Sequence, residues 1–463
     1  MASERSFEAL SEFFWKLEKE EDLLNWKVAG VHIWVEIRTK LYYSILAKEL
    51  GLEEKNAVAS TKKGPEHEVT SGQAEIYWRN LGRSKRKSAN RTALMPFNRR
   101  AKDGSDPLTT DLAKLLPADT LVFGTGIVDL ADISRTSMVR LQQFFQARYR
   151  IPAALMSLAT VSKVHQDKHS RIIGRLESEF DVDLSKWRKF FIYDLRRFLS
   201  ERWGYRKVFR HEGIKTLYLV NGERPSVIAG AQDVGVKVIE LQHGMLSKLH
   251  MRYNWLDIQA VPHSPNEFLI WGDYWKSVVN FAGSCNVKVM GANRNFEQYR
   301  SQIGKKIPNQ AVMISQPSLS IQFLEAAIST ARALPAIQFI VKPHPRENVV
   351  TLNDRLGLEK KLTNLRIADR NEDTLQLIVE SEFCFGVSST SVFEAVALQT
   401  KVLIYELPGW NHSQSLIERG EAVLVSDPAK AELFLKQVKL SSNPNYYYAD
   451  GSKLLPAIVK SNL

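Results

Sequence analysis

Residues 383–394 read Phe-Cys-Phe-Gly-Val-Ser-Ser-Thr-Ser-Val-Phe-Glu, and the pattern of this stretch decides the fold. Its apolar first part, up to Val387, predicts a buried strand, and the hydroxyl residues that follow open a helix expected over 390–399. The same alternation surrounds this stretch, with further strands expected at 311–315, 337–342, 365–368, 402–405 and 422–425. Strands that alternate with helices are typical of a parallel sheet covered on both faces.

A second series of strands precedes this one. Apolar runs predict strands at 92–96, 120–123, 216–220, 236–241, 268–271 and 287–290. Polar residues 302–309 are typical of a linker, so we predict an α/β protein with two Rossmann-like halves that face each other. The expected organisation is a helical extension with a polar loop over 1–88, a first domain over 89–300, a second domain over 301–445 and a helical tail over 446–463.

Hydroxyl residues follow the strand of the opening stretch. In open α/β sheets ligands bind beyond the carboxyl ends of the strands, so the loops at these ends are the candidate sites. Ser388, Ser389 and Thr390 lie where a helix begins, and its free N–H groups and dipole favour an anion. A structural role is the alternative, because Ser391-x-x-Glu394 fits a capping box. Both can hold together if that box closes the helix while the three hydroxyls face a ligand.

A basic histidine loop ends the strand expected at 337–342, and it reads Lys342-Pro-His-Pro-Arg346. Proline cannot donate to a sheet ladder, so His344 is held at the strand end with two cations beside it. A histidine donor flanked by cations suits a phosphate, whereas the alternative is a turn with solvated basic residues. This loop and the hydroxyl loop are expected to end strands of one sheet and to bind one phosphate together.

Carboxylates near these loops could contact the rest of a nucleotide. Glu372 or Asp373 could accept hydrogen bonds from ribose hydroxyls. Capping of the helix expected over 372–380 is the alternative.

The first half of the chain offers candidates for the reacting groups. Glu223 lies at the tip of the loop after the strand at 216–220 and is the candidate general base or charge stabiliser. Gln242, His243 and Gly244 end the next strand and are candidate contacts in the cleft. The sequence has no Gly-x-Gly-x-x-Gly, no Walker motif and no cluster at metal-ligand spacing, so we expect a reaction that needs no metal or other cofactor.

These motifs carry a resemblance to a known group of enzymes. Lys342-Pro-His-Pro-Arg346 followed by Gly386-Val-Ser-Ser-Thr390 resembles the paired HP and S-S/T motifs of bacterial sialyltransferases and of the related Kdo transferases of capsule and lipopolysaccharide assembly. Leu241-Gln-His-Gly244, the strand that begins at Phe268 and Val289-Met-Gly291 resemble the first half of the same group. The resemblance covers about residues 210 to 430.

The resemblance implies a GT-B fold, a nucleotide sugar on the second domain and the acceptor on the first. By this resemblance His344, Ser388 and Ser389 would hold the phosphate of a CMP-linked donor, and Glu372 would be placed for its ribose. Lys342, Pro345, Arg346 and Thr390 complete the donor set that these motifs imply. The general base of the group often lies in an acidic-acidic-Gly sequence, whereas this chain has Val220-Asn-Gly-Glu223, which leaves the base open.

The function implied is the transfer of an acidic sugar, Kdo or sialic acid, from a CMP donor to a capsule or lipopolysaccharide glycan. The nucleotide sugar would be a co-substrate, and both inverting and retaining mechanisms stay open. Polyol-phosphate transferases and UDP- or GDP-sugar transferases share parts of the pattern. A basic protein that binds nucleic acid or a membrane surface without catalysis is the remaining alternative.

Charge is concentrated in two segments of the first half. The chain carries 63 Lys+Arg against 51 Asp+Glu, a net charge of +12. Nine basic residues and no acidic one lie between Trp78 and Lys102, and nine more lie between Lys186 and Arg210, where helical spacing predicts a basic outer face. Because neither segment contains the phosphate loops, we expect an anionic or lipid-linked glycan, or the inner face of the membrane, as their partner, and a solvated basic face without a partner is the alternative. Nucleic acid is not expected, since zinc-finger and aromatic RNA-binding patterns are absent.

The location of the protein follows from what its sequence lacks. Only two cysteines, Cys285 and Cys384, are present, which favours a reducing compartment. The first residues do not resemble a signal peptide, and the longest nearly apolar run, 151–161, is far shorter than the roughly 20 residues that span a membrane. We therefore expect a cytoplasmic protein that can associate with the membrane peripherally.

Overall fold

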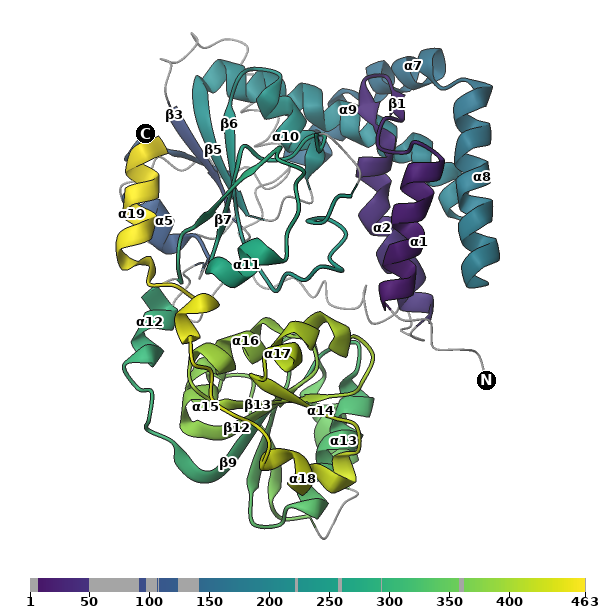
Figure 1. Cartoon of the computed structure of the whole chain (residues 1–463). Helices are drawn as coiled ribbons and strands as arrows, with labels where there is room; N and C mark the ends of the chain where they lie inside the picture. The colour runs from purple at the N-terminus through teal and green to yellow at the C-terminus, as the bar shows by residue number, and fades with distance from the viewer. Residues whose placement is uncertain are drawn as a thin grey trace.

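Two parallel six-stranded sheets form the two halves of the protein (Figure 1). The computed structural model describes residues 7–49, 91–96, 106, 108–123, 141–220, 224–256, 260–292, 294–357 and 362–462. The first sheet has the order β4-β3-β5-β6-β7-β8 and the second has the order β11-β10-β9-β12-β13-β14. The predicted class, two Rossmann-like domains of a GT-B-like fold with a helical extension, is confirmed.

The first sheet contains β3 (Arg91–Met95), β4 (Leu121–Val122), β5 (Ile214–Val220), β6 (Lys237–Leu241), β7 (Glu267–Ile270) and β8 (Asn286–Val289). Strands β3, β5, β6 and β7 are buried along almost their whole length, as the apolar runs predict, whereas the edge strand β8 is only partly buried. Among the described residues, the shorter helices that accompany it are α5 (Thr110–Leu115), α6 (Leu141–Arg148), α10 (Pro225–Gln232), α11 (Asp273–Ser277) and α12 (Arg294–Arg300).

The second sheet contains β9 (Ile307–Ile314), β10 (Gln338–Lys342), β11 (Leu365–Ile367), β12 (Ser381–Gly386), β13 (Lys401–Tyr405) and β14 (Ala422–Val425). Between them lie α13 (Ser320–Ala333), α14 (Val349–Gly357), α15 (Thr374–Glu380), α16 (Thr390–Ala397), α17 (Gln414–Glu418) and α18 (Ala431–Leu435). The linker expected over 302–309 is wrong at its end, because β9 begins at Ile307 and Ser381 of β12 pairs with that residue.

The helical extension packs beside the first domain. It consists of α1 (Phe7–Glu20), the ribbon β1 (Lys27–Val28) and β2 (Val31–His32), and α2 (Ile33–Glu49). Figure 1 shows these elements next to α7 (Arg150–Thr160), α8 (Lys163–Phe180) and the long α9 (Trp187–Glu212). Helix α9 contacts α2, α6, α7, α8 and α10, so it is the central helix of this part of the molecule.

The described basic residues predicted on the outer face of α9 are exposed or half-exposed, but carboxylates of neighbouring elements pair with several of them. Arg188 pairs with Glu177 at 2.7 Å and Arg202 with Asp233 at 2.7 Å. Arg197 pairs with Glu36 and, within its own helix, with Asp194. The exposed cations of α9 beyond this stretch are Arg206, Lys207 and Arg210.

The other basic segment, 78–102, lies outside the described residues apart from 91–96. Arg91 is buried there, and its guanidinium bonds the Glu212 carboxylate at 2.5 Å. This residue therefore stabilises the start of β3 and is not part of a basic surface.

A buried ion pair joins the extension to the first domain. Glu18 of α1 and Arg38 of α2 are both buried and bond each other in a two-pronged contact, with Arg38 Nη2 donating to Glu18 Oε2 at 3.1 Å. Trp34 Nε1 donates to the same carboxylate at 2.6 Å. Arg38 also donates to the carbonyl of Asn254 at 3.0 Å and lies over the ring of Trp255. One guanidinium thus connects two helices and a loop of the first domain.

The end of the chain returns from the second domain to the first. The backbone N–H of Ala449 donates to the carbonyl of Trp271 at 2.8 Å, and Trp275 Nε1 donates to the carbonyl of Tyr447 at 2.7 Å. Gly272 permits this approach, since a Cβ atom there would lie 2.5 Å from the carbonyl oxygen of Tyr446. The final helix, α19 (Gly451–Asn462), lies beside the first sheet in Figure 1. None of the described helices is long and apolar enough to cross a membrane.

We predict that Arg38→Ala lowers the free energy of unfolding by about 3–5 kcal/mol, because it leaves the Glu18 carboxylate buried without its partner. Urea denaturation followed by tryptophan fluorescence measures this change. The matched control is Arg355→Ala, which removes an exposed pair with Glu325 and should cost less than about 1 kcal/mol. Equal effects of the two substitutions would contradict the structural role of the buried pair.

Candidate functional site

The candidate site lies at the carboxyl edge of the second sheet. β9 stands between β10 and β12 and pairs in parallel with both, so the loops after these three strands share one edge. The chain moves outward from β9 through β10 to β11 and then returns to β12 on the other side of β9. This reversal makes the position between β9 and β12 the topological switch point, where open α/β sheets bind ligands.

The buried carboxylate of Glu347 organises the loop after β10. It accepts hydrogen bonds from the backbone N–H of His344 at 2.5 Å, from Ser315 Oγ at 2.7 Å and from Ser320 Oγ. Arg370 Nη2 donates to the Glu347 carbonyl at 2.7 Å. One residue therefore connects the ends of β9 and β10 and the start of α13. Glu347 is not among the residues predicted from the sequence, although an acid three positions after a strand-end histidine is a signal for such a turn.

A hydrogen bond to the ring of His344 fixes the tautomer of the neutral imidazole. Its Nδ1 accepts a hydrogen bond from the backbone N–H of Arg346 at 3.1 Å. A backbone N–H can only donate, so the proton of the neutral ring is on Nε2. The half-buried His344 thus presents a fixed N–H donor at the strand end, while the neighbouring Pro345 and Arg346 are exposed.

The hydroxyl loop after β12 is fixed by Gln316. Gln316 Oε1 accepts from the backbone N–H of Ser388 at 3.0 Å, and its Nε2 donates to the Ser388 carbonyl at 2.7 Å. Helix α16 begins at Thr390, and Ser389 is its N-cap, with a side chain that accepts from the Ser391 N–H at 3.3 Å. The capping box expected at Ser391 is wrong, since that residue already lies inside the helix. Sequence reasoning also missed Gln316, which lies 72 positions from its partner.

The third hydroxyl of this loop joins the two domains. Thr390 Oγ1 accepts from the backbone N–H of Met245 at 3.0 Å, and Gly244 lies against the same hydroxyl. Gln242 is fully buried and shapes this loop, because its side chain bonds the Gly244 carbonyl and the Trp271 N–H at 2.9 and 3.1 Å. The structure therefore brings the predicted donor loop and the predicted acceptor loop into contact, with the half-buried His243 between Gln242 and Gly244.

Two residues of the predicted donor set have internal partners. Lys342 is buried, and its ammonium donates to the carbonyls of Asp369 and Arg370 at 2.9 and 3.1 Å, so it fixes the loop after β11. Glu372 forms a two-pronged ion pair with Arg366 at 2.8 Å, and the hydrogen bond from that guanidinium lowers the pKa of the carboxyl. Contacts of Lys342 and Glu372 with a nucleotide stay predictions.

Asp373, the residue beside Glu372, caps a helix, which is the structural alternative given above for these carboxylates. Asp373 is the N-cap of α15 and accepts from the Gln376 N–H at 3.0 Å. The other sequence candidate, Glu223, lies outside the described residues. Within the described part of the chain, no three His, Cys, Asp or Glu side chains gather in a way that could hold a metal ion.

Histidines gather where the domains meet. His412 of the 3-10 helix Trp410–Ser413 hydrogen-bonds through Nδ1 to Ser247 Oγ at 2.7 Å, and the Phe7 ring lies 4.7 Å away. Burial lowers the pKa of His412 to about 4. Burial and then the neighbouring His243 and His412 lower the pKa of His250 to about 3. The two rings with lowered pKa values are therefore neutral at pH 7.

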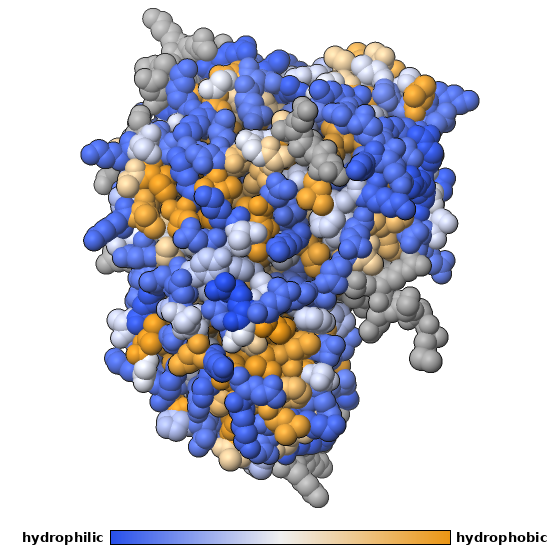
Figure 2. All heavy atoms as spheres, viewed as in Figure 1, coloured by the Kyte–Doolittle hydropathy of each residue, from blue (hydrophilic) through white to orange (hydrophobic). Residues whose placement is uncertain are grey.

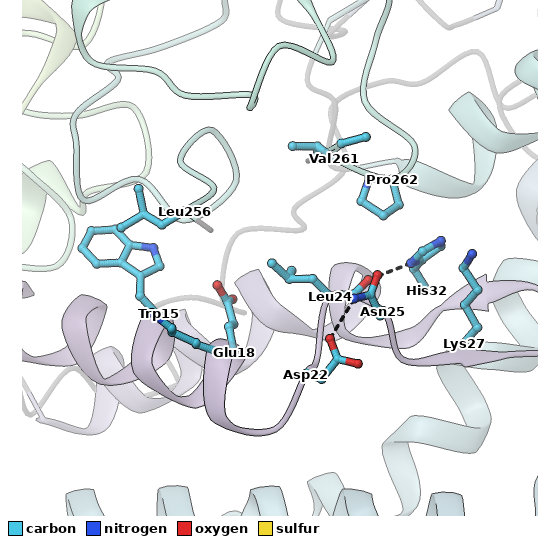
Figure 3. Close-up of a pocket in the computed structure, with 12 residues that line it drawn as sticks. Trp15, Glu18, Asp22, Leu24, Asn25, Lys27, His32, Leu256, Val261 and Pro262 are labelled. Carbon is cyan, nitrogen blue, oxygen red and sulfur yellow. Dashed lines mark hydrogen bonds between the residues drawn. The ribbon is translucent and has the colours of Figure 1, made fainter. Parts of the chain in front are cut away.

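A cavity lies beside the extension, away from the strand ends. It measures about 860 Å³ and opens between α1, the β1–β2 ribbon and the chain around Leu256 and Val261. Figure 3 shows Trp15 and Leu256 at one end and His32 and Lys27 at the other. Helix α1 also reaches the second domain, because Asn411 Nδ2 donates to Glu8 Oε1 at 3.1 Å. This cavity was not predicted from the sequence, because chain segments far apart in the sequence form it together.

We predict that stability falls as the pH drops from about 6.5 to 4. Unfolding exposes His412 and His250 to water, where they bind protons near pH 6.5, so the unfolded state holds more protons across this window. Each such histidine adds a slope of up to about 1.4 kcal/mol per pH unit. Denaturation series at several pH values should show a shallower slope for His412→Asn than for the parent chain. An unchanged slope would contradict the lowered pKa of the half-buried His412.

Comparisons with known proteins give matches among solved structures alone. No family model matches the sequence, and no curated protein matches it significantly. MurG of Acinetobacter baumannii is 10% identical with a TM-score of 0.42 and covers 81% of this chain and 99% of its own. UDP-GlcNAc 2-epimerase of Methanocaldococcus jannaschii, in complex with UDP-GlcNAc and UDP, is 12% identical with a TM-score of 0.42, covering 80% and 99%.

A third match is the α,α-trehalose-phosphate synthase (UDP-forming) of Burkholderia xenovorans in complex with glucose-6-phosphate. It is 10% identical with a TM-score of 0.39 and covers 80% of this chain and 97% of its own. The fold of the present chain follows from its own strand order and connectivity.

Proposed function

We propose that this protein transfers a glycosyl group from a nucleotide-activated donor to an acceptor at the domain contact. One observation carries the proposal: the His344 loop and the hydroxyl loop at Ser388 end the two strands that flank β9. Both loops are held in place by buried or half-buried side chains, Glu347 and Gln316. Such a preorganised edge suits the phosphate of a donor whose bond to the sugar breaks during transfer.

The chemistry expected of this edge is stabilisation of the leaving phosphate. The Nε2–H of His344 and the N-terminal N–H groups of α16 are donors for the negative charge that develops as the sugar departs. These donors are fixed before the substrate arrives, so little reorganisation is needed during the reaction. Glu223 remains the proposed base for the acceptor hydroxyl in an inverting mechanism.

The more specific part of the proposal is the identity of the nucleotide and of the sugar in the donor. The paired HP and S-S/T motifs favour a CMP-linked Kdo or sialic acid and a capsule or lipopolysaccharide glycan as acceptor. A UDP- or GDP-sugar, or a CDP-linked polyol, would use the same phosphate loops, so these donors are the direct alternatives.

We predict that His344→Ala lowers turnover by at least about 100-fold, because loss of one fixed donor to a developing oxyanion has this order of effect. Product analysis with CMP-Kdo, CMP-sialic acid, UDP-sugars and GDP-sugars as donors provides the assay. The matched control is His211→Ala, at the end of α9 in the other domain, which should retain activity. Near-normal turnover by a folded His344→Ala protein would overturn the phosphate assignment.

We predict that a matching nucleotide raises the melting temperature of the protein. At 100 times its Kd, a ligand that binds the native state alone stabilises it by about 2.7 kcal/mol. Thermal shifts with CMP, CDP, UDP and GDP should identify one base, and His344→Ala should weaken that response. CMP would support the acidic-sugar donor, whereas UDP or GDP would support the alternative. Salt-dependent binding to nucleic acid, with no response to any nucleotide, would contradict the enzymatic proposal.

A further inference from the structure

Helix α7 presents its large apolar side chains to the outside of the molecule. Ile151 and Leu158 are 72% exposed, and Leu155 is 62% exposed. At 100° per residue these three side chains lie on one face of the helix. The opposite face carries the small buried residues Ala153 and Ser157. A normal surface helix buries its large apolar side chains. Helix α7 instead exposes them and buries small residues.

Contacts with α9 hold the helix in this orientation. Arg196 Nε donates to Ser157 Oγ at 2.8 Å, and Ser157 Oγ donates to the Ala154 carbonyl at 2.8 Å. Small residues on the inner face let α7 approach α9 closely. Rotation of α7 to bury Leu155 and Leu158 would break these bonds and place bulky side chains against α9. The outward apolar face is therefore part of the packing.

The surroundings of this face are basic. Arg148, Arg150 and Lys163 are exposed at the two ends of α7, and no acidic residue occurs between 141 and 166. Val164 at the start of α8 continues the apolar surface and is 72% exposed.

Further cations approach from the neighbouring helix. Exposed Arg206, Lys207 and Arg210 of α9 line a concavity of about 450 Å³ together with Tyr149 and Pro152. We call the outward apolar residues of α7, together with Val164 and these exposed cations, the α7 surface.

We propose that the α7 surface binds the interface of an anionic lipid bilayer, with α7 parallel to the membrane plane. The helix has 11 residues, which is too short to span a bilayer and suits shallow insertion. Its outward residues would enter the acyl boundary while the flanking arginines and lysines contact lipid phosphates. Figure 1 places α7 at the end of the first domain that is remote from the second, and Figure 2 shows hydrophobic spheres at this corner.

Charge favours a lipid surface over a second copy of the chain. A symmetric dimer through α7 would place the same patch on both sides of the interface. Arg148, Arg150 and Lys163 would then face their own copies without an acid between them, which is unfavourable. An anionic bilayer instead supplies the opposite charge and an apolar layer at the same surface.

Vesicle flotation tests this proposal on the full chain. Vesicles of phosphatidylcholine alone are compared with vesicles that also contain phosphatidylglycerol. We expect flotation with the anionic vesicles, weaker flotation at high salt, and little with phosphatidylcholine alone. The double variant Leu155→Glu with Leu158→Glu should bind the anionic vesicles at least about tenfold more weakly. Both side chains are exposed, so the fold should be retained.

The matched control is Leu433→Glu on α18 of the second domain, where the side chain is 60% exposed. It should float like the parent chain. Equal flotation of the double variant and the parent would overturn the proposal, as would binding of the parent to neither kind of vesicle. A dimer in solution that the double variant converts to a monomer would assign the surface to a second copy instead. Transfer to a water-soluble acceptor should persist in the double variant, so failure of this proposal is distinguishable from failure of the proposed function.

Discussion

The hydrogen bonds to the Glu347 carboxylate determine the geometry of the candidate site. A buried carboxylate is costly unless it is fully bonded, and this one binds the His344 N–H and the hydroxyls of Ser315 and Ser320. These donors belong to the ends of two neighbouring strands and to the start of a helix. The satisfied carboxylate therefore fixes the turn in which the His344 ring accepts from the Arg346 N–H and keeps its proton on Nε2.

Coupling between the domains depends on the hydroxyl loop at the same sheet edge. Thr390 uses its hydroxyl to accept from Met245 of the first domain, while Ser389 caps the helix and Ser388 is held by Gln316. Three successive hydroxyl residues thus have three different partners. Movement of the first domain relative to the second would act directly on the first turn of α16. A ligand that binds the first turn of α16 would in turn act on this contact between the domains, since coupling between linked equilibria is reciprocal.

Local sequence patterns predicted the strands of both sheets and the placement of His344 and Ser388 at strand ends. They could not predict Glu347 and Gln316 as the groups that hold these loops, because each acts through partners that only the folded chain brings close. Lys342 shows the same limit: a lysine beside a histidine looks like a phosphate ligand, yet its ammonium bonds the carbonyls after β11. On α9 the helical period was correct, but periodicity does not report which neighbouring carboxylates cover the arginines.

The basic residues of the chain therefore fall into two groups, those paired with carboxylates inside the structure and those exposed around α7. Arg91, Arg38 and Arg197 are held by carboxylates inside the structure and contribute to stability. Residues 151–161 are too short to span a membrane, and a helix of this composition would normally be buried in a core. Here the small residues face inward, so the apolar residues and the cations at both ends reach the same surface. That combination is unfavourable in water and favourable at an anionic interface, which is the physical basis of the proposed binding of this surface to a bilayer.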